Sequence, residues 1–213
     1  FNCKAGRVLT EANMLWDIQT IKRNNINAVR TSHYPNHSLW YRLCDRYGVY
    51  LIDEANLESH GSWQKMGKVE PSWALPANVP EWRAACLDRA ASLLERDKNH
   101  PSVLLWSCGN ESYGGSNIFA MAEYFRGRDP LRPVHYEGVF NDRRYPASSD
   151  VESRMYPPAA EVAAWLDRDI TKPFVLCEYS HAMGNSCGGL ADYLALEDRY
   201  PQYAGGFIWD YID

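Results

Sequence analysis

Short apolar runs alternate with amphipathic segments along this chain, and the alternation constrains the fold more than any other feature. The clearest run, Val103-Leu104-Leu105-Trp106, leads within a few residues into a Gly-Asn-Glu triplet at 109–111. An apolar run of this length is typical of a strand buried on both faces of a parallel sheet. The same pattern predicts seven strands, at residues 26–29, 49–52, 103–106, 134–137, 152–156, 174–177 and 205–209.

Segments with helical spacing separate most of these strands. Two start signals are specific: Asn78 with Glu81 for a helix that runs to about residue 97, and Ser186 as the cap of the last helix. The predicted helices cover about 11–23, 37–47, 79–97, 117–126, 159–168 and 188–199, and a loop covers 61–80. Strand-helix alternation predicts an α/β fold with a parallel sheet. Seven strands are one short of a TIM (β/α)8 barrel, and 213 residues favour one domain.

Composition excludes some functions and leaves others open. The net charge of −5 argues against nucleic acid and anionic membranes as partners. The chain contains neither an apolar run long enough to span a bilayer nor a signal peptide. None of its six cysteines form a C-x-x-C pair, which favours free thiols in a reducing compartment. Its eight Trp and fourteen Tyr suit core packing or a sugar-binding cleft.

Two glutamates occupy matching positions at the ends of predicted strands. Glu111 follows the strand at 103–106, and Glu178 follows the strand at 174–177. Parallel α/β folds place their active sites at these ends. A pair of carboxylates across one cleft can hydrolyse a glycosidic bond, one as general acid and one as nucleophile. The alternative is that each glutamate pairs with a Lys or Arg at the rim of the barrel.

Other polar residues fall at the same predicted edge. Glu58 and His60 are two apart and could reach one ion, with Mg²⁺ favoured over Zn²⁺ if the remaining ligands are oxygens. The pair could equally be a chance pattern, and Asp53-Glu54 could supply the carboxylate instead. The candidate donors to an ionised nucleophile are Arg30, Tyr156 and His181. Trp209 ends the last strand and lies either at the cleft mouth or in the core.

Several competing motifs are absent or occur by chance. The glycines fit neither phosphate-binding pattern, and no serine lies in a G-x-S-x-G elbow. Sequons at Asn36 and Asn110 are interpreted as chance matches, because a glycan on Asn110 would block the predicted cleft.

Five sequence blocks together resemble the catalytic barrel of the β-galactosidases of glycoside hydrolase family 2, the lactose-splitting type of bacteria. These blocks occur in the same order, from about residue 6 to the end, at 24–37, 53–61, 106–112, 177–186 and 205–210. The resemblance implies that Glu111 is the acid/base and Glu178 the nucleophile. It also implies that Asn110 binds the sugar, and that Glu58, His60 and Glu111 hold Mg²⁺. The residues that would line the sugar site or orient the nucleophile are Arg30, His33, Tyr156 and His181, with Trp209 as a stacking platform.

The resemblance also explains the strand count. The family's barrel has eight strands, with the acid/base after strand four and the nucleophile after strand seven. Counting 26–29 as strand two places Glu111 and Glu178 at those positions, so residues 1–213 are expected to be a partial barrel without its first strand and last helix. The flanking β-sandwich domains are then missing too, and the ligands of any Na⁺ site cannot be assigned.

These implications predict a retaining enzyme that cleaves terminal β-D-galactosides through a covalent galactosyl-enzyme intermediate. Retention requires the two carboxyl groups to lie about 5 Å apart. The expected full-length enzyme is a bacterial cytoplasmic homo-oligomer. Two alternatives stay open: a β-glucuronidase or β-mannosidase of the same family, and an inactive barrel fragment that only binds sugar, because an open barrel exposes an unpaired strand edge.

Overall fold

A computed structural model of the chain describes residues 6–63, 74–168 and 170–211. Within these residues, strands and helices alternate and every paired strand is parallel. The strands are β1 (Ala28–Arg30), β2 (Tyr50–Glu54), β3 (Val103–Ser107), β4 (Val134–His135), β5 (Glu152–Met155), β6 (Phe174–Tyr179) and β7 (Tyr203–Ile208). The α-helices are α1 (Glu11–Arg23), α2 (Ser38–Tyr47), α3 (His60–Trp63), α4 (Arg83–Asp97), α5 (Ser116–Arg128), α6 (Ala159–Leu166) and α7 (Leu190–Arg199).

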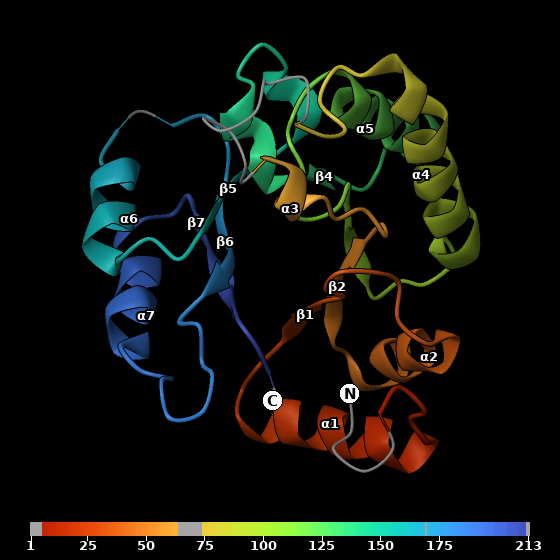
Figure 1. Cartoon of the computed structure of the whole chain (residues 1–213). Coiled ribbons are helices and arrows are strands. Elements are labelled where there is room, and N and C mark those ends of the chain that lie inside the picture. The colour runs from red at the N-terminus through yellow and green to blue at the C-terminus, as the bar shows by residue number, and fades with distance from the viewer. Residues whose placement is uncertain (1–5, 64–73, 169, 212–213) are drawn as a thin grey trace.

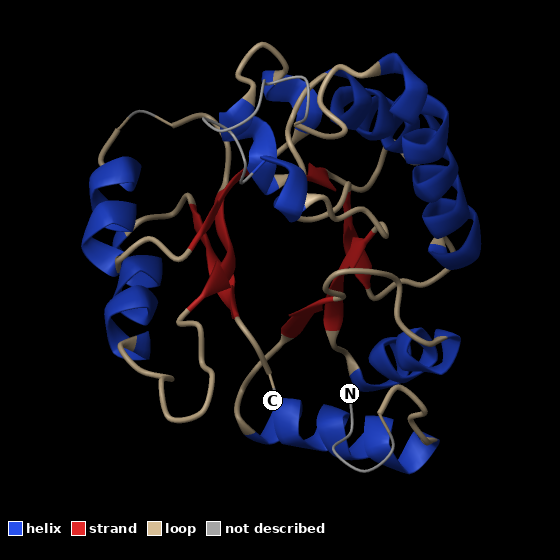
Figure 2. Ribbon diagram, in the orientation of Figure 1, coloured by secondary structure: helices blue, strands red, loops and turns tan. Residues whose placement is uncertain are grey.

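The strands form two sheets, ordered β1-β2-β3-β4 and β5-β6-β7. The sheets face each other across the centre of the molecule, and the helices lie around the outside (Figures 1 and 2). Between β4 and β5, a backbone bond from Asp150 N to Val134 O (2.7 Å) takes the place of a ladder. The described residues place no ladder between β1 and β7, where the sequence predicted an absent strand. The predicted partial (β/α) barrel is therefore confirmed.

The boundaries of two strands differ from the prediction in ways that bear on function. β4 ends at His135, two residues early, because a 3₁₀ helix, η3 (Glu137–Asn141), begins there. β6 runs on to Tyr179, so Glu178 lies within the strand and its backbone is fixed by the sheet.

The two helix caps predicted at Asn78 and Ser186 are not formed. Thr10 caps α1 through a capping box with Asn13. Asn78 does not cap the helix after it, because its Oδ1 accepts the Ser116 N–H at the start of α5 (2.8 Å). Ser186 does not cap α7 either, since its hydroxyl donates to carbonyls of its own loop, including that of His181 (2.7 Å).

The hydrophobic core has two parts, one for each sheet. The larger part packs α1, α2, α4 and α5 against the first sheet, with Trp106 and Tyr41 among its fully buried side chains. The smaller part packs α6 and α7 against β6 and β7 around Phe174 and Leu176. All five described cysteines are free thiols, and Cys3 lies outside the described residues. No described helix is long and apolar enough to span a membrane.

Candidate active site

Arg30, the last residue of β1, is the centre of a buried polar network. Its guanidinium donates to Glu54 Oε2 (2.8 Å), Glu178 Oε1 (2.7 Å) and Asn110 Oδ1 (2.7 Å). Burial opposes the charge of Arg30, but the two neighbouring carboxylates more than compensate and raise its pKa. One side chain thereby joins the ends of β1, β2, β3 and β6, although β1 and β6 belong to different sheets.

Glu178 is buried and held at both carboxylate oxygens. Arg30 donates to Oε1, and the Tyr156 hydroxyl donates to Oε2. Tyr156 follows β5 in a left-handed conformation (φ +58°), and its N–H donates to the Glu178 carbonyl at 3.0 Å. Glu178 does pair with an arginine, as the rim alternative proposed, but that arginine is itself buried inside the site.

The loop after β3 lies directly on the loop after β2, and Gly109 makes this approach possible. A Cβ at Gly109 would stand 2.6 Å from the Leu57 carbonyl, and the residue adopts φ +139°. Asn110 N donates to Leu57 O (2.9 Å), and Asn110 forms an isolated parallel bridge with Glu58. Without a glycine at 109, the two loops would have to separate, and the residues on them would not meet.

Asn110 links the two halves of this site. Its Oδ1 accepts from Arg30, while its Nδ2 donates to Glu58 Oε2 at 2.5 Å. The same Nδ2 lies 3.4 Å from His33 Nε2. Asn110 therefore shares Arg30 with Glu178 and also orients Glu58.

Glu111 is less buried than Glu178, with a quarter of its side chain exposed and its Oε2 paired to His60 Nδ1. Burial raises the pKa of Glu111; the charge of His60 opposes the rise, and the negative charges of Glu58 and Glu178 add to it. Glu111 has φ +36°, which costs a non-glycine residue on the order of 1–3 kcal/mol. A strained backbone and a raised pKa are both common at active sites.

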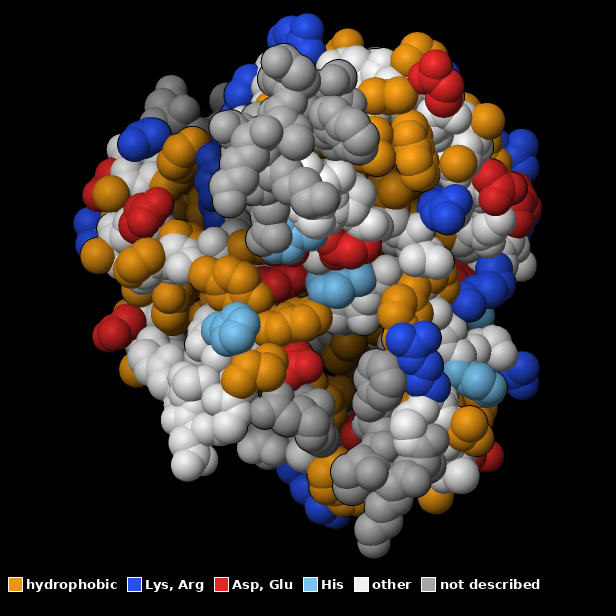
Figure 3. All heavy atoms as spheres, in the orientation of Figure 1, with side chains coloured by type: hydrophobic (Ala, Val, Ile, Leu, Met, Phe, Trp, Pro, Cys, Tyr) orange, Lys and Arg blue, Asp and Glu red, His pale blue; other side chains and the backbone are white. Residues whose placement is uncertain are grey.

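The remaining predicted residues surround this pair. His33 Nδ1 donates to Glu54 Oε1 (2.9 Å), and the His33 ring stacks on Trp209 with centroids 4.8 Å apart. Trp209 is partly exposed, so it lies at the site and not in the core. His181 is exposed and contacts Tyr156 edge to face at 5.4 Å. Acidic and histidine side chains gather in a hollow of the surface (Figure 3).

Glu58, His60 and Glu111 form the predicted cluster of metal-binding groups. Their ligating atoms lie within 4.8 Å of one another. Two carboxylates and one imidazole fit a hard divalent cation that keeps several waters, as Mg²⁺ does. Asp53 and Glu54, the alternative source of a metal-binding carboxylate, are engaged elsewhere. Glu54 binds Arg30, and Asp53 accepts from the Tyr41 hydroxyl at 2.6 Å.

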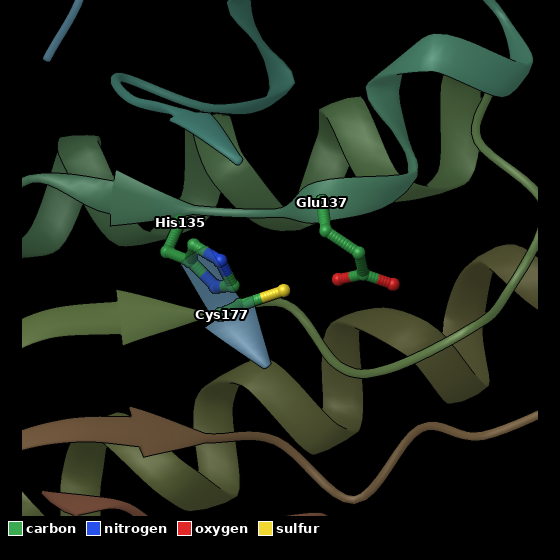
Figure 4. Close-up of side chains that lie close together, drawn as sticks. All are labelled: His135, Glu137 and Cys177. Carbon is green, nitrogen blue, oxygen red and sulfur yellow. The ribbon is translucent and has the colours of Figure 1, made fainter. Parts of the chain in front are cut away.

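The sequence reasoning gave no role to two buried residues behind the site, His135 and Glu137, and considered Glu54 only as a possible metal ligand. Figure 4 shows His135 and Glu137 close to Cys177 of β6, and ligating atoms of the three lie within 4.8 Å of one another. Both His135 ring nitrogens are already bonded to serine hydroxyls, Ser107 (3.0 Å) and Ser153 (2.9 Å). Burial lowers the pKa of His135 to about 3. His135 therefore links β3 and β5 through its two ring nitrogens.

Glu137 is the other consequential omission. Burial raises its pKa to about 8, opposed by Arg30 and supported by Glu54. Its Oε1 accepts the Glu111 N–H at 2.7 Å. Glu137 is the last residue of the strand predicted at 134–137, and assigning it to that strand concealed its role, because β4 ends at His135.

Replacing Arg30 with Met is expected to destabilise the protein strongly, because Glu54 and Glu178 would stay buried without their shared counter-charge. Removing one partner of a buried ion pair costs about 3–5 kcal/mol. Urea unfolding followed by tryptophan fluorescence measures this loss. Arg199→Met is the control, since Arg199 is exposed on α7 and pairs at 3.5 Å with Asp167. Equal stability of the two variants would contradict the structural role of Arg30.

Comparison with known proteins agrees with this geometry. The model of the glycosyl hydrolases family 2 TIM barrel domain matches residues 1–213. The chain belongs to glycosyl hydrolase family 2.

Its relatives in this family include proteins named β-galactosidase. Those of Clostridium acetobutylicum and Halalkalibacterium halodurans are each 62% identical over the whole chain. The chain spans 24% and 21% of their respective lengths. A β-galactosidase large subunit of Lactobacillus acidophilus is 57% identical, and the chain spans 34% of it.

Solved structures of two β-glucuronidases share the fold. The β-glucuronidase of Ruminococcus gnavus superimposes with a TM-score of 0.72 over 96% of this chain and 40% of its own, at 23% identity. The β-glucuronidase of Faecalibacterium prausnitzii gives a TM-score of 0.67 at 25% identity, again over 96% of this chain and 40% of its own. At these identities the likeness supports the barrel architecture and leaves the choice of sugar to other observations.

Proposed function

We propose that this chain carries the active site of a retaining β-galactosidase, with lactose-like β-D-galactosides as substrates. The observation that carries the proposal is that the two carboxyl groups have different surroundings. Glu178 is buried and held by Arg30 and Tyr156, while the pKa of Glu111 is raised. Whole-chain identity of 62% to proteins named β-galactosidase supports the choice of galactose.

In the first step, Glu178 attacks the anomeric carbon while Glu111 gives its proton to the oxygen of the leaving group. Arg30 and Tyr156 hold the attacking carboxylate in place, which keeps it in a productive orientation. In the second step, Glu111 takes a proton from water, and that water releases the sugar from Glu178. The anomeric configuration is retained because the carbon is inverted twice.

The polar residues around Glu178 are placed to bind the sugar. Asn110 and His33 lie beside Arg30 with polar atoms directed at the same network. Trp209 presents an aromatic ring at the edge of the site, which suits the apolar face of a galactose ring. His181 acts through its contact with Tyr156.

Glu58, His60 and Glu111 would hold Mg²⁺ in this enzyme. The bound ion would supply positive charge beside Glu111 and thereby tune the proton affinity of the carboxyl group. Asn110 keeps Glu58 directed towards this cluster through its 2.5 Å bond.

Chelation with EDTA is expected to lower turnover, and added Mg²⁺ to restore it. His60→Ala should weaken Mg²⁺ binding by at least 10-fold, since losing an outer-sphere partner already costs roughly 10–100-fold. Isothermal titration with MgCl₂ measures the change. His37→Ala is the control, because His37 caps α2 by accepting from Leu39 N at 3.1 Å. Equal Mg²⁺ affinity of the two variants would show that His60 is not a ligand of the ion.

Hydrolysis of nitrophenyl β-D-galactoside, β-D-glucuronide and β-D-mannoside by the natural polypeptide that carries this chain tests the substrate. We expect the galactoside to give the highest kcat/KM, and proton NMR to show the β-anomer as the first product. Preference for the glucuronide would favour the activity named for the structural neighbours instead.

The same assay on the 213-residue chain alone separates an active barrel from a fragment that only binds sugar. We expect weak or no turnover by the chain alone, because β1 and β7 share no ladder in the described structure. Homo-oligomerisation and a cytoplasmic location stay predictions.

A further inference from the structure

Glu137 makes a contact with Glu111 that the chemistry above does not use. It begins η3 directly beyond β4, and its side chain is buried. Its Oε1 accepts the backbone N–H of Glu111 at 2.7 Å. Its Oε2 has no hydrogen-bonding partner among the described residues. The Glu111 N–H is therefore a hydrogen-bond donor that holds this buried carboxyl group in place.

The Glu111 backbone needs such a contact, because its φ of +36° lies in the left-handed region. A non-glycine residue persists there only where its surroundings determine its conformation. The next peptide is held from the same side, since Ser112 N donates to the Tyr136 hydroxyl at 3.1 Å and that hydroxyl donates to Ser112 O. Residues 136 and 137 together clamp residues 111 and 112.

Gly138 shows that this clamp tolerates little change. A Cβ at Gly138 would stand 2.6 Å from the Tyr136 ring and 3.0 Å from Ser112 O. The chain after β4 thus turns tightly enough to bring two successive side chains onto the loop after β3.

We propose that Glu137 is a positioning residue, which fixes the direction of the Glu111 carboxyl group by accepting the Glu111 backbone N–H. This inference rests on the proposed role of Glu111 as acid/base. Without the acceptor, the strained peptide relaxes and carries the carboxyl group away from the leaving-group oxygen. Proton donation then fails, whereas attack by Glu178 is preserved because Arg30 and Tyr156 hold it independently.

Leaving-group dependence distinguishes such a defect from general damage. A sugar-linked oxygen, as in lactose, needs a proton to depart, whereas 2,4-dinitrophenolate departs without one. A misplaced acid therefore slows only the first kind of substrate. The measured quantity is kcat/KM in the natural polypeptide, for lactose and for the dinitrophenyl galactoside.

Three variants of Glu137 and one control variant test the role of the acceptor. Glu137→Met removes the acceptor and keeps a side chain of similar size. Glu137→Asp shortens the side chain by one methylene and serves if the Met variant does not fold. Glu137→Gln keeps a carbonyl oxygen at the same reach. Glu152→Met is the matched control, because Glu152 of β5 pairs with Arg154 (2.7 Å) and with Arg143 (3.1 Å).

Glu137→Met and Glu137→Asp are expected to lower kcat/KM for lactose about 10–100-fold, since a misplacement of the order of 1 Å costs up to about 100-fold. The dinitrophenyl galactoside should change less than about 3-fold. Glu137→Gln and Glu152→Met should stay close to wild type on both substrates. Equal losses on both substrates, or a Gln variant as impaired as the Met variant, would overturn the inference.

The proposed function fails in a different way. If the wild-type enzyme cleaves glucuronides and not galactosides, the choice of sugar is wrong and the same comparison is made on glucuronides with good and poor leaving groups. Selective loss on the poor leaving group would still support Glu137. A wild-type enzyme that cleaves no glycoside would overturn both proposals.

Discussion

Glu178→Gln is expected to reduce turnover by at least about four orders of magnitude, the scale seen when a covalent nucleophile is removed. Glutamine has the same shape but cannot form the glycosyl ester. The fold should persist, because Arg30 keeps its two bonds to Glu54. Activity on the nitrophenyl galactoside and the thermal unfolding midpoint measure the two effects separately.

Glu197→Gln, an identical change at an exposed position of α7, is the control for this substitution. Labelling with a 2-deoxy-2-fluoro galactoside gives independent evidence, because the slowed second step leaves the sugar attached. Mass spectrometry should locate the adduct on Glu178. An adduct elsewhere, or an active Gln variant, would exclude Glu178 as the nucleophile.

Glu111→Ala is expected to lower kcat/KM for lactose by roughly 10²–10⁴-fold, the usual contribution of a general acid. The dinitrophenyl galactoside should lose little in its first step and accumulate as galactosyl-enzyme, because no base then activates water. Added azide, a nucleophile that needs no base, should restore turnover and yield the β-galactosyl azide. Lactose and dinitrophenyl galactoside impaired to the same extent would argue against Glu111 as the acid.

The pH profile follows from the same residue. Glu111 donates a proton only in its protonated form, so kcat/KM falls as the pH rises through its pKa. Without bound Mg²⁺, burial together with the charges of Glu58 and Glu178 raises that pKa despite His60, which moves this limb of the profile to higher pH. Glu111→Ala should abolish this limb of the profile, and a limb that persists would have to be assigned to another group.

Glu111 and Glu178, the two carboxyl groups of the proposed mechanism, were predictable as candidates because each belongs to a local pattern. An apolar run followed at once by polar residues fixes both the strand and the end at which those residues lie. Arg30 was a candidate from its place at a strand end, whereas Asn110 and His33 were named through the family resemblance. In the structure Arg30 donates to both Glu178 and Asn110, and His33 Nε2 lies 3.8 Å from Glu178 Oε1. The spacing of Glu58 and His60 could equally be a chance pattern. Only the family resemblance identified them as candidate metal ligands.

What could not be predicted depends on contacts between distant parts of the chain. Asn78 has the local signature of a helix cap, yet it bonds to Ser116, 38 residues away. The local pattern around Glu137 fits a strand, but its function depends on an amide 26 residues earlier. Asn78 meets Ser116 where the segments after β2 and β3 come together, and Glu137 meets Glu111 because β4 pairs with β3.

The parallel α/β architecture and the strand ends that carry Glu111 and Glu178 could be predicted from the residues in order, because hydrophobic periodicity and strand-end position are local properties. The difference between the two glutamates arises only when the chain is folded. Arg30 and Tyr156 hold one of them, whereas burial and neighbouring negative charge raise the pKa of the other. Proton affinity depends on the groups that surround a carboxyl in space, and here those groups come from five different strand ends.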